Sequence, residues 1–204
     1  MAYQQQPIFQ DQGVCVVGQQ FCAPYPIELT VQQKAISFSG GDFTVTDSAG
    51  NVVFKVAGKV MSLHDRRVLQ DAAGNPLLTM KQKTFTMHKR WEAFKGDSSD
   101  QQNFLFTARK SSMLQLKTAL DVFLAGNKEE KHSDFHVKGS FLERSCTIYR
   151  GDRIVAEMKR KYTVTNVVLG KDTYAVVMQP GIDYAFIVAL IVLLDEINDD
   201  RTDE

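Results

Sequence analysis

The feature that most constrains this chain is an uninterrupted apolar run near its C-terminus, from Tyr184 to Leu194. Its 11 residues would extend about 16 Å as a helix, at about 1.5 Å per residue. A bilayer core is about 30 Å thick, so the run is too short to span a membrane. A helix that is apolar on all sides and cannot span a bilayer is expected to be buried in protein. The rest of the chain is therefore expected to enclose it.

Alternating segments precede this run, and alternation is typical of strands with one buried and one wet face. In Thr84–Phe94, Trp91 and Ala93 fall on one face, with Arg90 and Glu92 on the other. Leu114–Leu124 also fits a helix, but we favour a strand. Further candidate strands are Phe104–Lys110, Phe135–Lys138, Cys146–Tyr149, Ile154–Tyr162 and Thr173–Met178.

A short internal repeat predicts hairpins. The motif Asp-x-x-Gly-Asn occurs at residues 47–51 and again at 71–75, 24 residues later, each time between apolar segments. Asp opens a turn by accepting backbone hydrogen bonds, and Gly supplies the left-handed position. A helix is predicted only at the end, from Ile182 to about Asn198, with Asp183 capping its first turn. Many strands and one apolar helix predict a mainly β fold, a sheet closed into a barrel around the helix.

Composition divides the chain into three parts. Residues 1–20 hold seven Gln and one charge, Asp11, so we expect a disordered tail. Residues 21–198 form a single predicted barrel domain, and residues 199–204 form an acidic tail. A secretory signal has a basic region and a long apolar run, and the N-terminus of this chain has neither. The three cysteines are too few for a disulfide framework.

Six stretches carry a family resemblance: Cys22–Pro26, Leu63–Leu69, Ser111–Leu116, Gly139–Cys146, Leu169–Asp172 and Asp183–Phe186. Through them the chain resembles the plant LURP-one-related proteins, whose fold is similar to the tubby C-terminal domain and the phospholipid scramblases. The resemblance implies an antiparallel barrel of about twelve strands around a central hydrophobic C-terminal helix. It also implies membrane tethering through phosphoinositides and a link to transcription or plant defence. The family has no established catalytic residues, so we expect no enzyme activity, no cofactor and no metal.

Net charge is zero, but its distribution is uneven. The last ten residues hold six acids and one Arg, whereas residues 55–117 hold 12 basic and 5 acidic residues. A basic face can attract phospholipid headgroups or nucleic acid, although a solvated surface explains scattered lysines equally well. The candidate headgroup-binding residues are Lys89, Arg90, Arg109, Lys110, Lys159 and Lys161. A nucleic-acid-associated factor and a protein-interaction scaffold remain the alternatives to a lipid-binding module.

Other constellations are weaker. His132, Asp134 and His136 could hold a metal if they shared a strand face, but they border a charged loop. His64 and His88 adjoin basic residues and could grip a phosphate, or could fill equivalent hairpin positions.

The three cysteines and the single tryptophan are expected to have structural roles. Cys15 and Cys22 are expected to be free thiols, with acylation as the alternative, and Cys146 and Trp91 are expected in the core. We expect an intracellular protein, in the cytoplasm, at the inner face of the plasma membrane or in the nucleus.

Overall fold

The computed structural model describes residues 13–33, 43–57, 66–83, 90–111, 118–140, 145–160 and 173–199. They form twelve strands, two short 3-10 helices and one α-helix. The strands are β1 (Ile27–Gln33), β2 (Phe43–Thr46), β3 (Val52–Ala57), β4 (Arg66–Asp71), β5 (Pro76–Lys83), β6 (Arg90–Lys95), β7 (Phe104–Lys110), β8 (Thr118–Leu124), β9 (Phe135–Ser140), β10 (Ser145–Arg150), β11 (Arg153–Arg160) and β12 (Thr173–Met178). The 3-10 helices are η1 (Gln19–Phe21) and η2 (Gln101–Asn103), and the α-helix is α2 (Tyr184–Asp199).

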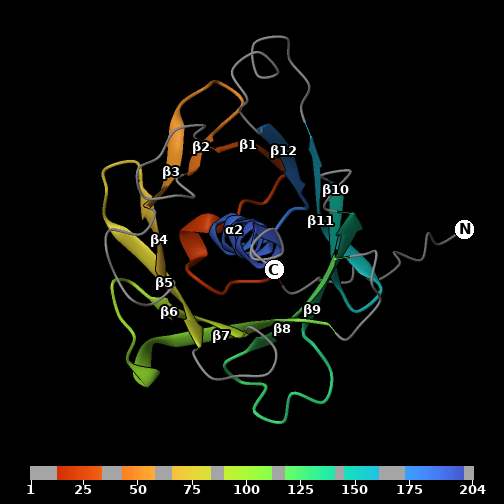
Figure 1. The fold of residues 1–204 in the computed structure, drawn as a ribbon. Coiled ribbons are helices and arrows are strands. Elements are labelled where there is room, and N and C mark those ends of the chain that lie inside the picture. The colour runs from red at the N-terminus through yellow and green to blue at the C-terminus, as the bar shows by residue number, and fades with distance from the viewer. Residues whose placement is uncertain are drawn as a thin grey trace, which may run out of the picture.

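The twelve strands form a closed antiparallel barrel (Figure 1). Each strand pairs with its neighbours in sequence, and β1 pairs with β12 to close the sheet, with Leu29 opposite Val176. Closure leaves no exposed sheet edge within these strands. Inward positions are apolar and buried along successive strands, as the alternation predicts.

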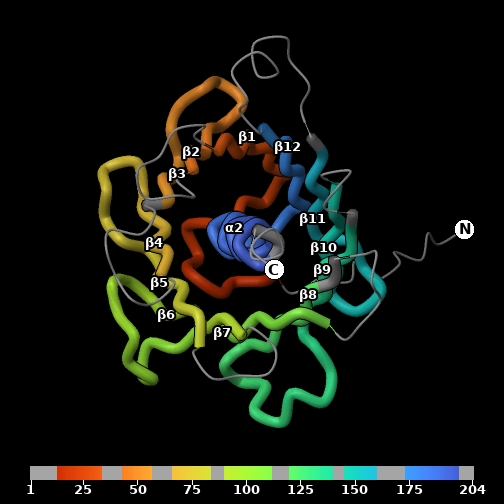
Figure 2. The backbone as a smooth tube through the Cα atoms, in the orientation of Figure 1, coloured from red at the N-terminus to blue at the C-terminus, as the bar shows by residue number. Residues whose placement is uncertain are grey.

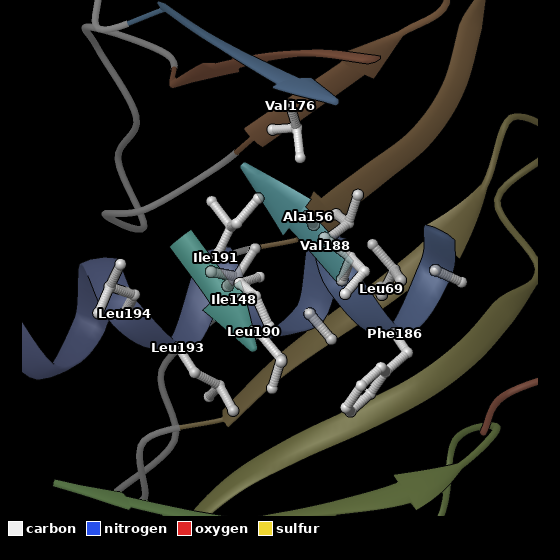
Figure 3. Packing of buried hydrophobic residues seen from close by; sticks show 14 of the residues in the cluster. Leu69, Ile148, Ala156, Val176, Phe186, Val188, Leu190, Ile191, Leu193 and Leu194 are labelled. Atoms are coloured by element: carbon white, nitrogen blue, oxygen red, sulfur yellow. The ribbon is translucent and has the colours of Figure 1, made fainter. Parts of the chain in front are cut away.

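The helix α2 occupies the centre of the barrel, surrounded by the strands (Figure 1). Its residues from Ala185 to Val192 are at most 3% exposed, and side chains point from it towards several strands (Figure 3). Phe186 makes edge contacts with Phe106 and Phe135 at ring distances of 5.2 and 5.0 Å. The apolar run is therefore enclosed in protein, as the sequence predicts. No helix in the described part of the chain is long and apolar enough to cross a membrane.

The barrel has two different ends. One end, the hairpin end, contains the two Asp-x-x-Gly-Asn turns. The even-numbered strands finish there, and α2 begins there. Asp47 and Asp71 accept backbone N–H bonds from Asn51 and Asn75, both at 2.8 Å, so the repeat forms the predicted hairpins. Gly50 and Gly74 have left-handed φ values of 86° and 94°. At the helix-exit end, odd-numbered strands finish and α2 ends.

An N-terminal segment, residues 13–22, closes the hairpin end and passes around the start of α2 (Figure 2). Asp183 is fully buried, and its Oδ2 accepts N–H bonds from Val16, Val17 and Gly18 at 3.0, 2.7 and 3.1 Å. Its Oδ1 accepts the Phe186 N–H at 3.0 Å, which confirms the helix cap. Val14 and Val17 are in the core, although they lie within the residues that composition assigns to the tail. The division into tail, domain and acidic end stays a prediction.

A charged pair lies inside the barrel near the helix-exit end. The Nη2 atom of Arg67, on β4, is 2.5 Å from Oε1 of Glu196, on α2, and both residues are less than 10% exposed. Next to it on the helix, Asp195 accepts a hydrogen bond from Gln33 of β1 at 3.1 Å. These contacts link the end of α2 to two walls of the barrel. Arg67 is therefore not part of any outward basic face.

Element boundaries follow the predictions closely where the structure describes them. The strands β7 and β12 have the predicted bounds, and Leu114–Leu124 contains strand β8, as favoured over a helix. Trp91 and Cys146 are 1% and 3% exposed, so both are core residues. The helix runs from Tyr184 to Asp199, close to the predicted bounds.

Candidate functional site

The described members of the predicted headgroup set lie near the helix-exit end, where β6 begins and β7 and β11 finish: Arg90, Arg109, Lys110 and Lys159. Arg90 starts β6 and Arg109 is next to last in β7. Because Trp91 pairs with Ala108 and both face inward, Arg90 and Arg109 are neighbours on the outer wall. These two arginines, which are 19 positions apart in the sequence, are therefore adjacent across two paired strands.

One carboxylate joins the two arginines. Glu130 comes from the loop between β8 and β9, and its Oε2 accepts hydrogen bonds from Arg90 Nη2 and from Arg109 Nη1, the latter at 3.3 Å. The three side chains of Arg90, Arg109 and Glu130 are 23%, 32% and 22% exposed, so the Arg90–Glu130–Arg109 cluster is accessible from solvent. Two guanidinium groups face one carboxylate, so these three groups together carry one net positive charge.

The loop that supplies Glu130 is held by its own polar contacts. Asp134 Oδ2 accepts the Leu124 N–H and the Asn127 side-chain N–H, both at 2.9 Å, while Asn127 Oδ1 accepts the Glu130 N–H at 3.2 Å. Glu130 has a φ of 48° and is the only non-glycine residue with positive φ in the described part of the chain. Such a conformation is unfavourable for a residue with a side chain. The contacts of Glu130 with Asn127 and with the two arginines hold it in that conformation.

A shallow hollow adjoins the cluster. It has a volume of about 390 Å³ and is lined by Thr107, Phe123, Asn127, Lys128 and Glu130, among others. Phe123 and Thr107 point outward, yet they are only 3% and 2% exposed. The Arg109 guanidinium lies 4.5 Å from the centre of the Phe123 ring, a distance at which a cation is attracted to an aromatic face.

A second polar pair continues the row of outward side chains. Asp121 is opposite Arg109 in the register of β7 and β8, and His136 is opposite Asp121 in that of β8 and β9. His136 Nδ1 and Asp121 Oδ1 are 2.6 Å apart. The trio His132, Asp134 and His136, considered above as a weak metal candidate, has other partners: His136 contacts Asp121, and Asp134 accepts from Leu124 and Asn127.

The remaining candidates are more dispersed. Lys110 is exposed at the end of β7. Lys159 lies on β11, four strands away from β7, and its Nζ is 4.0 Å from Glu157 Oε1 on the same strand. Lys89, Lys161, His64 and His88 lie outside the described residues. The structure thus brings Arg90 and Arg109 together and places Lys159 on another wall.

Sequence reasoning missed Glu130 as a partner of this site. Residues 126–133 read as a charged loop, and nothing local indicates which wall that loop contacts. Glu130 reaches Arg90 and Arg109 because this loop folds back over the outer wall towards β6 and β7. The mixed charges of residues 128–131, Lys-Glu-Glu-Lys, were the available signal, and they do not identify a partner.

A closed barrel of twelve antiparallel strands with a hydrophobic helix as its core defines the class of this protein. Within that class, the chain belongs to the LURP-one-related family, whose model matches residues 27–195. The chain is 53% identical over 188 residues to Protein LURP-one-related 15 of Arabidopsis thaliana, covering 91% of this chain and 87% of that protein. It is 45% identical to Protein LURP-one-related 10 of the same plant, covering 94% and 100% of the two chains.

A solved structure has the same fold. The X-ray structure of an Arabidopsis thaliana protein matches with a TM-score of 0.72 and 42% sequence identity, covering 91% of this chain and 99% of that one. Both the barrel and the family expected from the sequence are thereby confirmed.

Proposed function

We propose that this chain is a non-enzymatic binding module that attaches to anionic phospholipid of the phosphoinositide class at a membrane surface inside the cell. The proposed contacts are the six candidate basic residues, Lys89, Arg90, Arg109, Lys110, Lys159 and Lys161. The described ones among them lie near the helix-exit end. Resemblance to tubby-like proteins and phospholipid scramblases supports the lipid class. The same resemblance supports a proposed link to transcription or plant defence, with the nucleus as a second location.

The observation that carries this proposal is the convergence of Arg90 and Arg109 on Glu130. Guanidinium groups bind phosphate through paired N–H donors. A phosphorylated headgroup carries more negative charge than one carboxylate, so it can replace Glu130 between the two arginines. The partial exposure of all three side chains allows that exchange.

The filled barrel supports a binding role over a catalytic one. The side chains of α2 occupy the interior, and residues Ala185 to Leu190 are fully buried. A substrate would therefore have to bind on the outer wall or at the ends. There, the hollow beside Glu130 is shallow and its described lining includes no cysteine or histidine. Surface recognition of a charged group fits this arrangement better than enclosed chemistry.

The test is liposome co-flotation of the full chain with neutral vesicles and with vesicles that contain phosphatidylinositol bisphosphate, at low and physiological salt. Each basic group near an anionic surface contributes about 1 kcal/mol. Replacing both Arg90 and Arg109 with Gln should therefore lower binding about 30-fold. Glu130→Gln should strengthen binding, because it removes the competing carboxylate. Higher salt should weaken binding in every case.

The matched control replaces Lys55 and Lys95 with Gln, the same change in charge at exposed positions outside the cluster. Duplex DNA is added as a competitor in a parallel series. Equal losses in the arginine and lysine variants would contradict a specific headgroup site. Release by DNA would favour the nucleic-acid alternative, and no flotation at physiological salt would favour a protein-interaction scaffold.

A further inference from the structure

Two thiols meet at the hairpin end, beside the start of α2. Val14 pairs with Ile182, and Cys22 pairs with Asp183, so the two ends of the N-terminal segment lie on either side of residues 182–183. This arrangement places Cys15 next to Cys22. Their sulfur atoms and a carboxylate oxygen of Asp183 all lie within 4.8 Å of one another, and the Cys22 thiol donates to the carbonyl oxygens of Val14 and Gly18 at 3.5 and 3.8 Å.

This trio has the composition of a metal site, but Asp183 is already engaged. Its two oxygens accept four backbone N–H bonds, from Val16, Val17, Gly18 and Phe186. A metal on this carboxylate would compete with the helix cap and with the anchoring of residues 16–18. The two adjacent thiols of Cys15 and Cys22 are then the reactive groups of this cluster, and two adjacent thiols can form a disulfide.

We propose that Cys15 and Cys22 are a redox-active pair that forms a reversible disulfide by exchange with a low-molecular-weight disulfide of the oxidised glutathione class. The inference is independent of the lipid-binding proposal. It rests on the proximity of the two sulfurs and on the unequal access of the two thiols: Cys15 is exposed, whereas Cys22 is half-buried. Two thiols at this separation need only a local adjustment to reach disulfide geometry.

Access assigns the order of steps. The Cys15 thiol loses its proton, and its sulfur attacks one sulfur of oxidised glutathione, whose S–S bond breaks and releases one glutathione. Cys22 then loses its proton, and its sulfur attacks Cys15 Sγ, releasing the second glutathione. The two cysteines are oxidised together, and one glutathione disulfide is reduced to two thiols. Burial and the adjacent Asp183 raise the pKa of Cys22 to about 12, which disfavours Cys22 as the first attacking thiol. Its later attack depends on its proximity to Cys15 Sγ.

The disulfide would fasten residues 15–22 into a closed ring against residues 182–183. The backbone amides that bind Asp183 lie inside that ring. Oxidation is therefore expected to restrain local opening of the segment that closes the hairpin end, and reduction to restore it.

The experiment equilibrates the full chain in buffers of increasing oxidised-to-reduced glutathione ratio, traps free thiols by alkylation and maps the peptides by mass spectrometry. We expect a Cys15–Cys22 disulfide that dithiothreitol reverses. Cys146, 3% exposed, is the internal control and should remain a thiol. In Cys22→Ser, a stable glutathione adduct should accumulate on Cys15, whereas Cys15→Ser should form little adduct.

Stability and exchange report on the restraint. Oxidation should raise the Tm of the wild-type chain by about 5 °C and slow amide exchange at residues 16–18, and neither change should occur in Cys15→Ser. The proposal is overturned if both thiols stay reduced at every ratio, if the wild-type chain stops at the Cys15 adduct, or if Cys15 links two chains. If the disulfide forms but the Tm does not change, the proposed restraint of the N-terminal segment is wrong.

Discussion

The Asp183 carboxylate organises more of this molecule than any other single polar group that the structure describes. It caps α2 and also binds three consecutive amides of the N-terminal segment. We expect Asp183→Ala to lower the free energy of unfolding by about 3–5 kcal/mol, because buried N–H groups lose their acceptor. Urea unfolding measures this loss. Asp47→Ala, at an exposed turn, is the control, and an equal effect of the two variants would contradict the central role of Asp183.

Close backbone packing at one glycine gives a second prediction at the residue scale. A Cβ atom on Gly139 would lie 2.3 Å from the Ser145 carbonyl oxygen and 2.6 Å from Cys146 Cβ. Gly139→Ala should therefore force β9 and β10 apart and cost about 1–3 kcal/mol or more, measured by thermal unfolding. Gly126→Ala is the matched control, because a Cβ atom added at that position would meet nothing within 4 Å. Similar costs at the two sites would refute the steric argument.

At the scale of elements, each of the two repeated hairpins has an Asp carboxylate that is hydrogen-bonded within its own turn. The side-chain amides of Asn51 and Asn75, assisted by backbone N–H groups, hold the pKa values of Asp47 and Asp71 below their usual range. A lowered folded-state pKa means that the stabilisation is present above the unfolded-state pKa of about 3.9. It is lost as pH falls through the lower, folded-state pKa.

Replacing both Asp47 and Asp71 with Asn should therefore make the Tm less sensitive to pH between about pH 5 and pH 2 than in the wild-type chain. The Tm at each pH, measured by circular dichroism, provides the test. Asp152→Asn is the control, since this residue lies in the turn between β10 and β11, away from both repeated hairpins. A Tm that falls equally steeply in all three proteins would rule out the hairpins as the source.

At the scale of the whole molecule, the helix and the barrel share a single core. Trp91, on the wall, and the residues of α2 belong to one cluster of buried side chains, and Arg67 and Glu196 join wall and helix near the other end. Neither part can bury its apolar surface alone. Unfolding should therefore be one cooperative transition.

Trp91 is the only tryptophan, so its fluorescence reports on the wall alone. We expect its emission and the amide exchange of α2 to give the same free energy of unfolding in denaturant. Earlier exchange of α2, while Trp91 remains buried, would show that the helix leaves an intact barrel. Arg67→Met should lower both values together, since it leaves Glu196 buried without its partner.

The sequence by itself determined the elements that depend on local pattern. An apolar run too short for a bilayer specified a buried helix, alternation specified strands, and the repeated Asp-x-x-Gly-Asn motif specified two hairpins. Each of these follows from interactions within a few residues. The predicted cap at Asp183 was equally local, and its role was confirmed because the helix dipole and free N–H groups act over one turn.

Only the tertiary structure decided which distant residues meet. The register of β6 against β7 set Arg90 beside Arg109, a fold-back loop brought Glu130 to both, and Arg67 turned inward to Glu196. The anchoring of residues 16–18 and the meeting of Cys15 with Cys22 likewise depend on a segment that packs more than 150 positions away in the chain. Charge and thiol chemistry depend on distance in space, and sequence patterns encode only distance along the chain.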